Sequence, residues 1–142
     1  MMDLTPKADE VFARDLYATQ TTGVKLEMVK QDYARCTVEL QLLHRNAMGG
    51  VMGGVMFTLA DLAFAAAANS HCIEAEEPLS WVSTDSNIHF IAQPSGNLLI
   101  AETQCVKRSR TSCLFLINIH DEKNNIMAVV TTSGRRITLQ NT

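Results

Sequence analysis

The chain has 142 residues, of which 46% are hydrophobic and 19% are charged, a balance that is typical of globular proteins and excludes intrinsic disorder. This length is enough to bury a sizeable core, so we expect a single domain over residues 1–142. The net charge of −3 gives no electrostatic reason to expect a nucleic-acid partner.

The N-terminus lacks the features of an export signal, because it has neither a basic region nor an apolar core. The four cysteines, at positions 36, 72, 105 and 113, form no Cys-x-x-Cys pair. The four histidines show no metal-ligand spacing. We therefore expect a cytoplasmic protein with reduced thiols and no metal site.

The N-terminal third is predicted to contain one helix and two strands. Residues 7–17 place apolar side chains at helical spacing between charged ones, which predicts a short amphipathic helix that covers the core. Residues 24–30 and 33–42 alternate between polar and apolar side chains, which predicts two strands. Only Gln31 and Asp32 separate them, so we expect a hairpin.

The rest of the chain is organised around residues 46–69, a glycine-rich turn followed by a long apolar run. Between positions 55 and 68 only Thr58 and Asp61 are not apolar, and a helix that is apolar on every side is expected to be wrapped by the rest of its protein. The run from position 53 to about 72 is borderline in length for a membrane span. Its alanine-rich middle, its acid and its polar flanks argue against a span, so we expect a buried helix and no membrane contact.

Asp61 needs an explanation, because burying an ionised carboxylate is costly unless the group is paired or takes up a proton. It either faces a polar seam or a basic partner, or it lies beside a ligand as a general base or nucleophile. The glycines before the helix make a tight turn, and they also let the backbone approach a ligand. The first amides of the helix, at Gly53 and Gly54, are free donors for a developing oxyanion. An acid about two turns downstream is expected to reach the same small volume.

Four further strands are predicted after the helix, over residues 81–91, 98–106, 113–119 and 126–139. In the first of them Ser83, Asp85 and Asn87 share one parity, which predicts a polar face that either meets water or walls a pocket. Strands on both sides of one long helix predict an α+β domain, in which a mostly antiparallel sheet of five or six strands curls around that helix.

Lys107, Arg108 and Arg110 are the densest positive cluster, at the join between two predicted strands. Three cations at one turn suit the oxygens of a phosphate-bearing ligand. The alternative is a solvated turn whose charges keep a sheet edge soluble. Arg135 and Arg136 form a weaker second candidate.

Two motifs resemble those of a known family: Asn46-x-x-Gly49-x-Val51-Met52-Gly53-Gly54 and Thr58-Leu59-Ala60-Asp61. They are similar to the signature of the hotdog-fold acyl-CoA thioesterases, above all the phenylacetyl-CoA thioesterase (PaaI-like) branch of the 4-hydroxybenzoyl-CoA thioesterase superfamily. Weaker similarity extends from about residue 25 to residue 137. The family usually has His where this chain has Met52, and Met neither titrates nor forms strong hydrogen bonds.

The resemblance implies a hotdog fold and the hydrolysis of an aryl- or medium-chain acyl-CoA, with coenzyme A as part of the substrate and no separate cofactor. Asp61 would be the general base or the nucleophile, and the amide of Gly53 or Gly54 the oxyanion site. Asn46 would orient the acyl end or the water. A Ser or Thr near position 83, for which we favour Ser83 over its neighbour, would help to place the water.

The resemblance also implies an assembly. In the family two subunits pair edge to edge, so that Asp61 of one chain would meet the Asn46 and Gly53–Gly54 loop of the other. A homodimer is then the minimal active unit, and a homotetramer the next level. The turn equivalent to residues 107–110 helps to hold the nucleotide and phosphates of coenzyme A in the family.

Met52 and Phe57 are candidates for lining the acyl pocket, although core packing is the commoner role of such side chains. Three alternatives to the enzyme remain open. The first is an acyl-CoA-binding protein with little turnover, because Met52 replaces the usual His. The second is a hotdog dehydratase or hydratase, whose usual His this loop lacks. The third is a protein that serves assembly alone.

Overall fold

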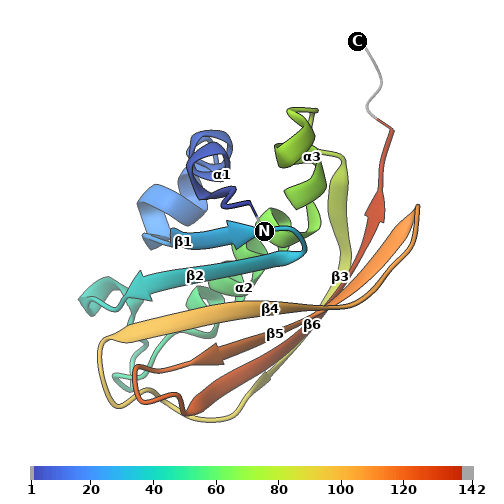
Figure 1. Ribbon diagram of the computed structural model, residues 1–142. Helices are drawn as coiled ribbons and strands as arrows, with labels where there is room; N and C mark the ends of the chain where they lie inside the picture. The colour runs from blue at the N-terminus through green and yellow to red at the C-terminus, as the bar shows by residue number, and fades with distance from the viewer. Residues whose placement is uncertain (1, 139–142) are drawn as a thin grey trace.

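The computed structural model describes residues 2–138, which form a six-stranded antiparallel sheet curled around one long helix (Figure 1). In chain order the elements are α1 (Thr5–Phe12), a π-helical turn (Tyr17–Thr22), β1 (Lys25–Lys30), β2 (Tyr33–Glu39), a 3-10 turn (Leu42–His44), α2 (Gly53–Ala68), α3 (Ser70–Ala75), β3 (Trp81–Phe90), β4 (Leu98–Arg108), β5 (Ser112–His120) and β6 (Ile126–Arg136). The order across the sheet is β1-β2-β4-β5-β6-β3. This arrangement confirms the predicted α+β fold, with β1 and β2 as the predicted hairpin.

The last predicted strand is shorter than expected, because β6 ends at Arg136 and position 139 lies outside the described residues. Within residues 2–138, none of the helices combines the length and the apolar character that crossing a lipid bilayer requires.

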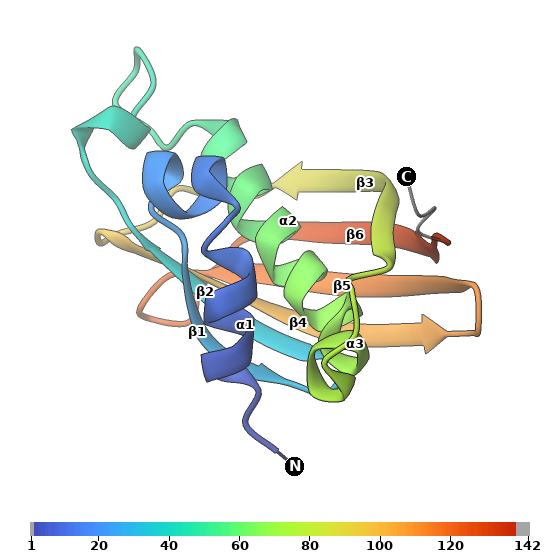
Figure 2. The same ribbon diagram turned by 90° about the horizontal axis from the view of Figure 1, so that it is seen from above.

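The core lies between α2 and the concave face of the sheet, across which α2 runs (Figure 2). β5 shows why these residues form strands: Cys113, Phe115, Ile117 and Ile119 are buried at every second position, which is the period of a strand. The Phe115 ring meets Phe64 of α2 edge to face, with 5.6 Å between the ring centroids. Burying each such side chain contributes about 1.5–3 kcal/mol to folding.

The N-terminal helix is shorter than predicted, because α1 ends at Phe12 and the chain then makes a π-helical turn that closes at Gly23, with φ of 84°. The first residues also meet β1. The Leu4 amide donates to the Val29 carbonyl at 2.8 Å, and the Val29 amide donates to the Thr5 hydroxyl at 2.9 Å. The start of the chain therefore covers the outer edge of β1 at Val29.

The predicted central helix is interrupted at Asn69, so that α2 and α3 take the place of one continuous helix. The buried Asn69 side chain donates to the carbonyls of Ala65 at 2.9 Å and Trp81 at 3.1 Å. Its oxygen accepts from the amides of Ser80 at 3.1 Å and Trp81 at 2.9 Å. The three bonds to Ser80 and Trp81 tie the end of α2 to the start of β3.

A bulge in β3 changes which residues share a face. Ser83 opposes Gly134, whereas Asp85 opposes Ser133, so Thr84 is an extra residue without an opposite partner. The prediction that Ser83, Asp85 and Asn87 share one face is therefore wrong. Ser83 lies on the side of the buried Gly134, and the other two lie on the opposite side.

Gly134 is the position in the sheet where a side chain has no room. A Cβ there would lie 2.6 Å from Phe64 Cζ, 2.9 Å from Cys113 Sγ and 2.9 Å from the Val82 carbonyl oxygen. Because one neighbour is backbone, the clash cannot be relieved by a side-chain rotation alone. We expect Gly134→Ala to lower the free energy of unfolding by about 1–3 kcal/mol, as measured by urea denaturation.

The matched control is Gly54→Ala, where a Cβ would meet nothing within 4 Å. Since Ala is the better helix former, this change should leave stability unchanged or raise it by up to about 1 kcal/mol. Equal losses of stability in both variants would contradict the packing argument.

Candidate active site

Residues 2–138 leave one stripe of α2 uncovered. Gly54, Phe57 and Asp61 are exposed, and Thr58 and Ala65 are half-buried. These positions recur every three or four residues, so they lie along one face of the helix. The prediction that the chain wraps α2 on every side is wrong for this stripe, whereas the opposite faces are buried as expected.

The stripe forms one wall of a cleft of about 370 Å³. The other wall is the segment that follows α1. The lining residues are Asp15, Leu16, Tyr17 and Ala18 on the N-terminal side and Phe57, Thr58, Asp61, Leu62 and Ala65 on α2. Sequence reasoning missed the N-terminal wall, because nothing in its residues indicates that it lies beside a helix that begins at Gly53, far along the chain. The position of Thr58 in the lining could have been predicted, because it precedes Asp61 by one helical turn and therefore lies on the same face of α2.

Asp61 is exposed in this cleft rather than buried in the core, which corrects the expectation from the sequence. The surrounding protein still displaces part of its water, which raises the pKa of the carboxyl, and repulsion by Asp15 raises that pKa further. Among residues 2–138, no Lys or Arg forms an ion pair with Asp61. A carboxyl with a raised pKa in a cleft is typical of functional sites.

α2 begins at Gly53 and Gly54, whose amides have no acceptor inside the helix. A Cβ on Gly53 would lie 2.9 Å from Phe90 Cζ, whereas Gly54 has open space around it. Asp61 lies about 12 Å further along the same helix, at 1.5 Å per residue. The expectation that Asp61 reaches the same small volume as these amides is therefore wrong within one chain.

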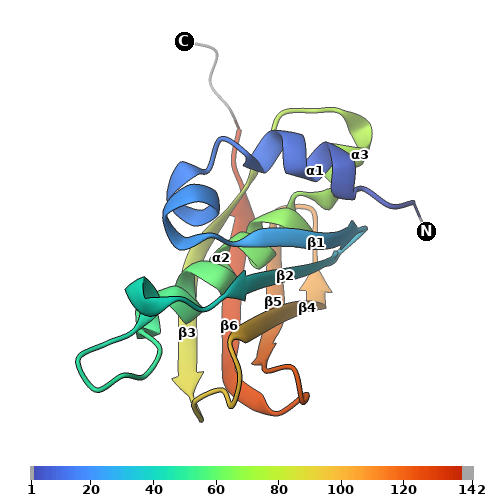
Figure 3. The same cartoon turned by 90° about the vertical axis from the view of Figure 1, so that its left-hand side faces the viewer.

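Asn46 organises the loop that leads into α2. Its Oδ1 accepts from the amides of Met48 at 2.9 Å and Gly50 at 3.0 Å, and its own amide donates to the Gly50 carbonyl at 2.7 Å. Gly49 has φ of 85°, a conformation that favours glycine. The loop projects from the body of the molecule (Figure 3). Within residues 2–138 the Asn46 Nδ2 group donates to no acceptor, so it is available to a ligand.

His44 fixes the base of this loop. Its Nδ1 accepts from the Gln41 amide at 2.9 Å, so its Nε2 carries the proton and donates to the Thr22 carbonyl at 2.7 Å. The Met52 amide donates to the His44 carbonyl at 2.9 Å. The buried His44 thus connects the loop to the N-terminal segment, a role that the sequence did not indicate.

The structure separates the other predicted lining residues. Phe57 lines the cleft together with Asp61, but Met52 does not, although its side chain is exposed just before α2. Ser83 is exposed on β3 and is not among the residues that line the cleft. The hydroxyl of its neighbour Thr84 donates to the Ser133 carbonyl at 3.1 Å.

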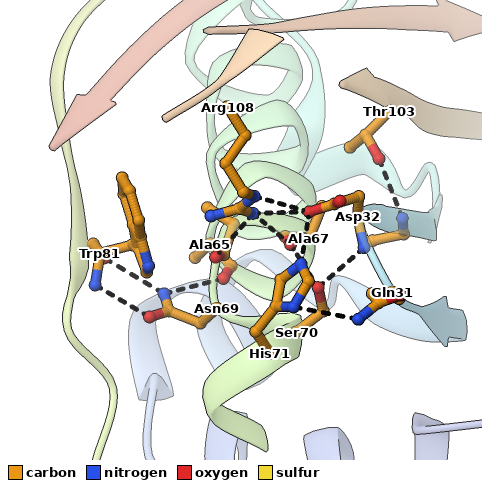
Figure 4. A network of polar contacts seen from close by, with 12 residues as sticks. Gln31, Asp32, Ala65, Ala67, Asn69, Ser70, His71, Trp81, Thr103 and Arg108 are labelled. Atoms are coloured by element: carbon orange, nitrogen blue, oxygen red, sulfur yellow. Dashed lines mark hydrogen bonds and ion pairs between the residues drawn. The ribbon is translucent and has the colours of Figure 1, made fainter. Parts of the chain in front are cut away.

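Arg108 points towards Asp32 and the end of α2 (Figure 4). Its Nε donates to Asp32 Oδ1 at 2.8 Å, and its Nη2 donates to the carbonyls of Ala67 at 3.4 Å and Ala68 at 3.0 Å, at the end of α2. The guanidinium also lies 4.8 Å from the centroid of the Trp81 ring. With 17% of its side chain exposed, Arg108 is not a free cation at the turn, which corrects its assignment to a phosphate clamp.

Asp32 is the centre of this inward network, which Figure 4 shows. His71 Nε2 lies 3.1 Å from Asp32 Oδ1, and Gln31 Nε2 lies 3.0 Å from His71 Nδ1. The Asp32 amide donates to Ser70 Oγ at 2.8 Å. The network joins the β1–β2 turn, the end of α2, the start of α3 and the end of β4.

Arg110 lies in a different place, beside Arg136. Both line a cavity of about 420 Å³ to which Lys107 does not contribute. Hydroxyl groups of the same cavity come from Ser80, Thr111 and Thr138, and Glu77 is its acidic member. Two guanidinium groups with hydroxyl donors are suited to phosphate oxygens.

Comparisons with known proteins agree with this architecture. A family model described as the thioesterase superfamily matches residues 48–128. A protein of Archaeoglobus fulgidus, provisionally named an esterase, is 31% identical over 112 residues, which cover 79% of this chain and 69% of that protein.

Solved structures resemble the fold. The PaaI protein of the Escherichia coli phenylacetic acid degradation operon is 24% identical, with a TM-score of 0.79 over 98% of this chain and 99% of that chain. A mutant of the phenylacetic acid degradation protein PaaI from Thermus thermophilus is 22% identical, with a TM-score of 0.73 over 84% of this chain and 97% of that chain. These likenesses confirm the hotdog fold that the two motifs implied.

Proposed function

The chain belongs to the thioesterase superfamily, and on this premise we propose that it hydrolyses the thioester bond of an acyl-CoA with an aryl or medium-chain acyl group. The observation that carries this proposal is the position of Asp61. Its carboxyl has a raised pKa in a largely apolar cleft, on a helix that begins with two glycine amides free to donate.

The active unit would be a pair of chains joined through β3. Within residues 2–138 this strand pairs with β6 alone, and most of its residues are exposed. A long exposed edge strand is a template for pairing with another strand. Exposed apolar side chains near the start of α2 also favour an interaction surface there. They are Met52, Phe57, Phe90 and Ile91.

Pairing of two chains would also supply oxyanion donors beside Asp61, which its own helix cannot place there. Because Asp61 lies about 12 Å from the first amides of its own helix, a thioester beside Asp61 needs its oxyanion donors from elsewhere. In a pair, Gly53, Gly54 and Asn46 of the second copy would provide them. Two such pairs would make the homotetramer that the family resemblance implies.

In the proposed reaction the thioester oxygen accepts from the amide of Gly53 or Gly54 as negative charge develops on it, an effect worth about 3–4 kcal/mol. Asp61 either takes a proton from the attacking water or attacks the carbonyl carbon itself, forming a mixed anhydride that water hydrolyses. On both routes the C–S bond breaks, the CoA thiolate takes up a proton and the free acid is released. Thr58 and Ser83 are candidates for holding the water.

The coenzyme A end is proposed to bind through Arg110 and Arg136, the two guanidinium groups that share a cavity. Lys107 remains a candidate at the same turn, whereas Nε and Nη2 of Arg108 donate to groups inside the protein.

One observation favours a second candidate function, an acyl-CoA-binding protein with little turnover. Met52 lies at the N-cap of α2, where the resembling family has His, and its side chain neither titrates nor donates a proton. Restoring the histidine with Met52→His would test whether the natural residue limits the rate.

A panel of aryl- and medium-chain acyl-CoAs, with released thiol as the readout, tests the proposal. Turnover by the wild-type protein supports the enzyme. Tight binding of the same esters without turnover would favour the binding protein, and absence of both would show that the proposed function is wrong.

The rate should depend on pH through Asp61, which must be ionised to act as a base or nucleophile. Because the pKa of Asp61 is raised, kcat/KM should fall on the acid side at a pH above the usual range for aspartate. Asp15→Asn removes the nearby negative charge, so it should lower the pKa of Asp61 and move this acid limb to lower pH. A pH series of kcat/KM measures the shift.

Glu10→Gln is the matched control for charge, because Glu10 is exposed on α1 and does not line the cleft. Its acid limb should coincide with that of the wild type. An acid limb that stays in place in Asp15→Asn, or moves to higher pH, would contradict the electrostatic coupling between the two carboxyls.

A further inference from the structure

The N-terminal wall of the Asp61 cleft is a fixed part of the fold. Phe12 anchors it on one side by burial in the core. On the other side the Thr22 carbonyl accepts from His44, and the Val24 amide donates to the Ala18 carbonyl at 2.9 Å. Because both ends are held, the backbone between them keeps its side chains beside the cleft.

This surface is apolar and open. Leu16 is 55% exposed and Tyr17 is 68% exposed, so both leave apolar surface in contact with water. Across the cleft they face Phe57, Leu62 and Ala65 of α2. An apolar ligand between these walls would remove water from both of them.

The charges in the cleft have one sign. Asp15 and Asp61 are the carboxylic acids of the lining, and the described part of the chain contributes no Lys, Arg or His to it. The pKa of Asp61 is raised because displacement of water and the negative charge of Asp15 both disfavour its ionised form. A third carboxylate brought between the walls would meet the same repulsion, and none of these lining residues is a cation that could offset it.

We propose that Asp15, Leu16 and Tyr17 make this cleft selective for neutral, apolar acyl groups and against acyl groups that end in a carboxylate. This inference rests on the proposed thioesterase function, because it takes the cleft as the acyl site. Leu16 and Tyr17 provide the apolar contact, and Asp15 repels a second carboxylate.

The test uses two CoA thioethers of equal chain length, S-butyl-CoA and S-(3-carboxypropyl)-CoA. Neither can be hydrolysed, so isothermal titration calorimetry measures their Kd whether or not the protein turns over a thioester. At neutral pH and low salt the wild-type protein should bind S-butyl-CoA at least about tenfold more tightly, because the repulsion acts on the carboxylated ligand alone. Similar Kd values for the two ligands would overturn the proposal.

Two variants assign the selectivity to the N-terminal wall. Asp15→Asn should narrow the ratio of the two Kd values several-fold, whereas Glu10→Gln should leave it at the wild-type value. Leu16→Ala combined with Tyr17→Ala should weaken S-butyl-CoA but not free CoA. Wild-type selectivity that persists unchanged in Asp15→Asn would show that Asp15 is not its source.

A salt series on the wild type covers the case in which the variants do not fold. Raising the salt concentration should narrow the Kd ratio, since exposed charges are screened. A ratio that is independent of salt contradicts an electrostatic origin. A failure of the proposed thioesterase function would be seen separately, because neither butyryl-CoA nor succinyl-CoA would then release thiol. The Kd values of the two thioethers would still show whether the cleft discriminates against a carboxylate.

Discussion

Replacing Asp61 with Asn is expected to lower kcat/KM for acyl-CoA hydrolysis by about 10²–10⁴-fold. Asn keeps the shape of the side chain and can still hydrogen-bond, but it neither takes a proton from water nor attacks a carbonyl carbon. The loss should appear mainly in kcat, because the apolar walls of the cleft and the cavity of Arg110 and Arg136 are unchanged. Steady-state kinetics with the best substrate of the panel measures it.

The same variant should keep its fold. The pKa of Asp61 is raised in the folded chain, so the folded state binds this proton more tightly than the unfolded chain does. That contribution to stability is present at low pH and is lost as pH rises through the raised pKa. A neutral Asn avoids the loss, so Asp61→Asn should melt at or above the wild-type temperature at neutral pH.

Glu74→Gln is the matched control, because Glu74 is an exposed carboxylate on α3, away from the cleft. It should retain wild-type kinetics and melting temperature. Full activity in Asp61→Asn would remove the basis of the proposed mechanism, and a strong fall in its melting temperature would make Asp61 a structural residue instead.

The largest expected loss of stability comes from Arg108→Met, at about 2–4 kcal/mol in the free energy of unfolding. The change leaves the Asp32 carboxylate without its guanidinium partner and removes the Arg108 donor from the Ala68 carbonyl. It also removes the longer bond to the Ala67 carbonyl, which keeps the Ser70 hydroxyl as a donor. The contact between the cation and the Trp81 ring is lost as well. Urea denaturation followed by circular dichroism measures the change.

Lys107→Met is the control, since Lys107 is the exposed neighbour on the same strand and should change stability by about 0.5 kcal/mol or less. The double variant Arg108→Met with Asp32→Asn should lose less than the sum of the single changes, because removing both partners leaves no unpaired charge. A loss in Lys107→Met as large as in Arg108→Met would contradict the structural role of Arg108.

The fold followed from the sequence because its signals are local. Alternation in residues 33–42 and the apolar run after Gly53 each indicate an element without knowledge of its neighbours, and a single long helix among strands then favours one arrangement. The interruption at Asn69 was not predictable, because it depends on bonds to Ser80 and Trp81, which only the folded chain brings close.

The site was predictable where residue type alone carries the chemistry. An acid in an apolar helix is conspicuous, and so are glycines before it. The open stripe was not predictable. Asp61 is the one ionisable residue of α2, and alanines and large apolar residues occur on both the exposed and the buried faces of the helix, so the sequence does not distinguish the two faces. Likewise, sequence places Arg108 beside Lys107 but does not give the direction of its side chain, which Asp32 sets from a distant turn.

The two ends of the sheet differ, and the difference bears on how large an assembly can grow. β1 has its outer edge occupied at Val29 by Leu4 and Thr5 of the same chain, whereas no strand within residues 2–138 pairs with the outer edge of β3. Copies that join through their free edges leave only the capped edges facing outward. Such growth stops at two, so strand addition produces a closed unit and not an open-ended fibril.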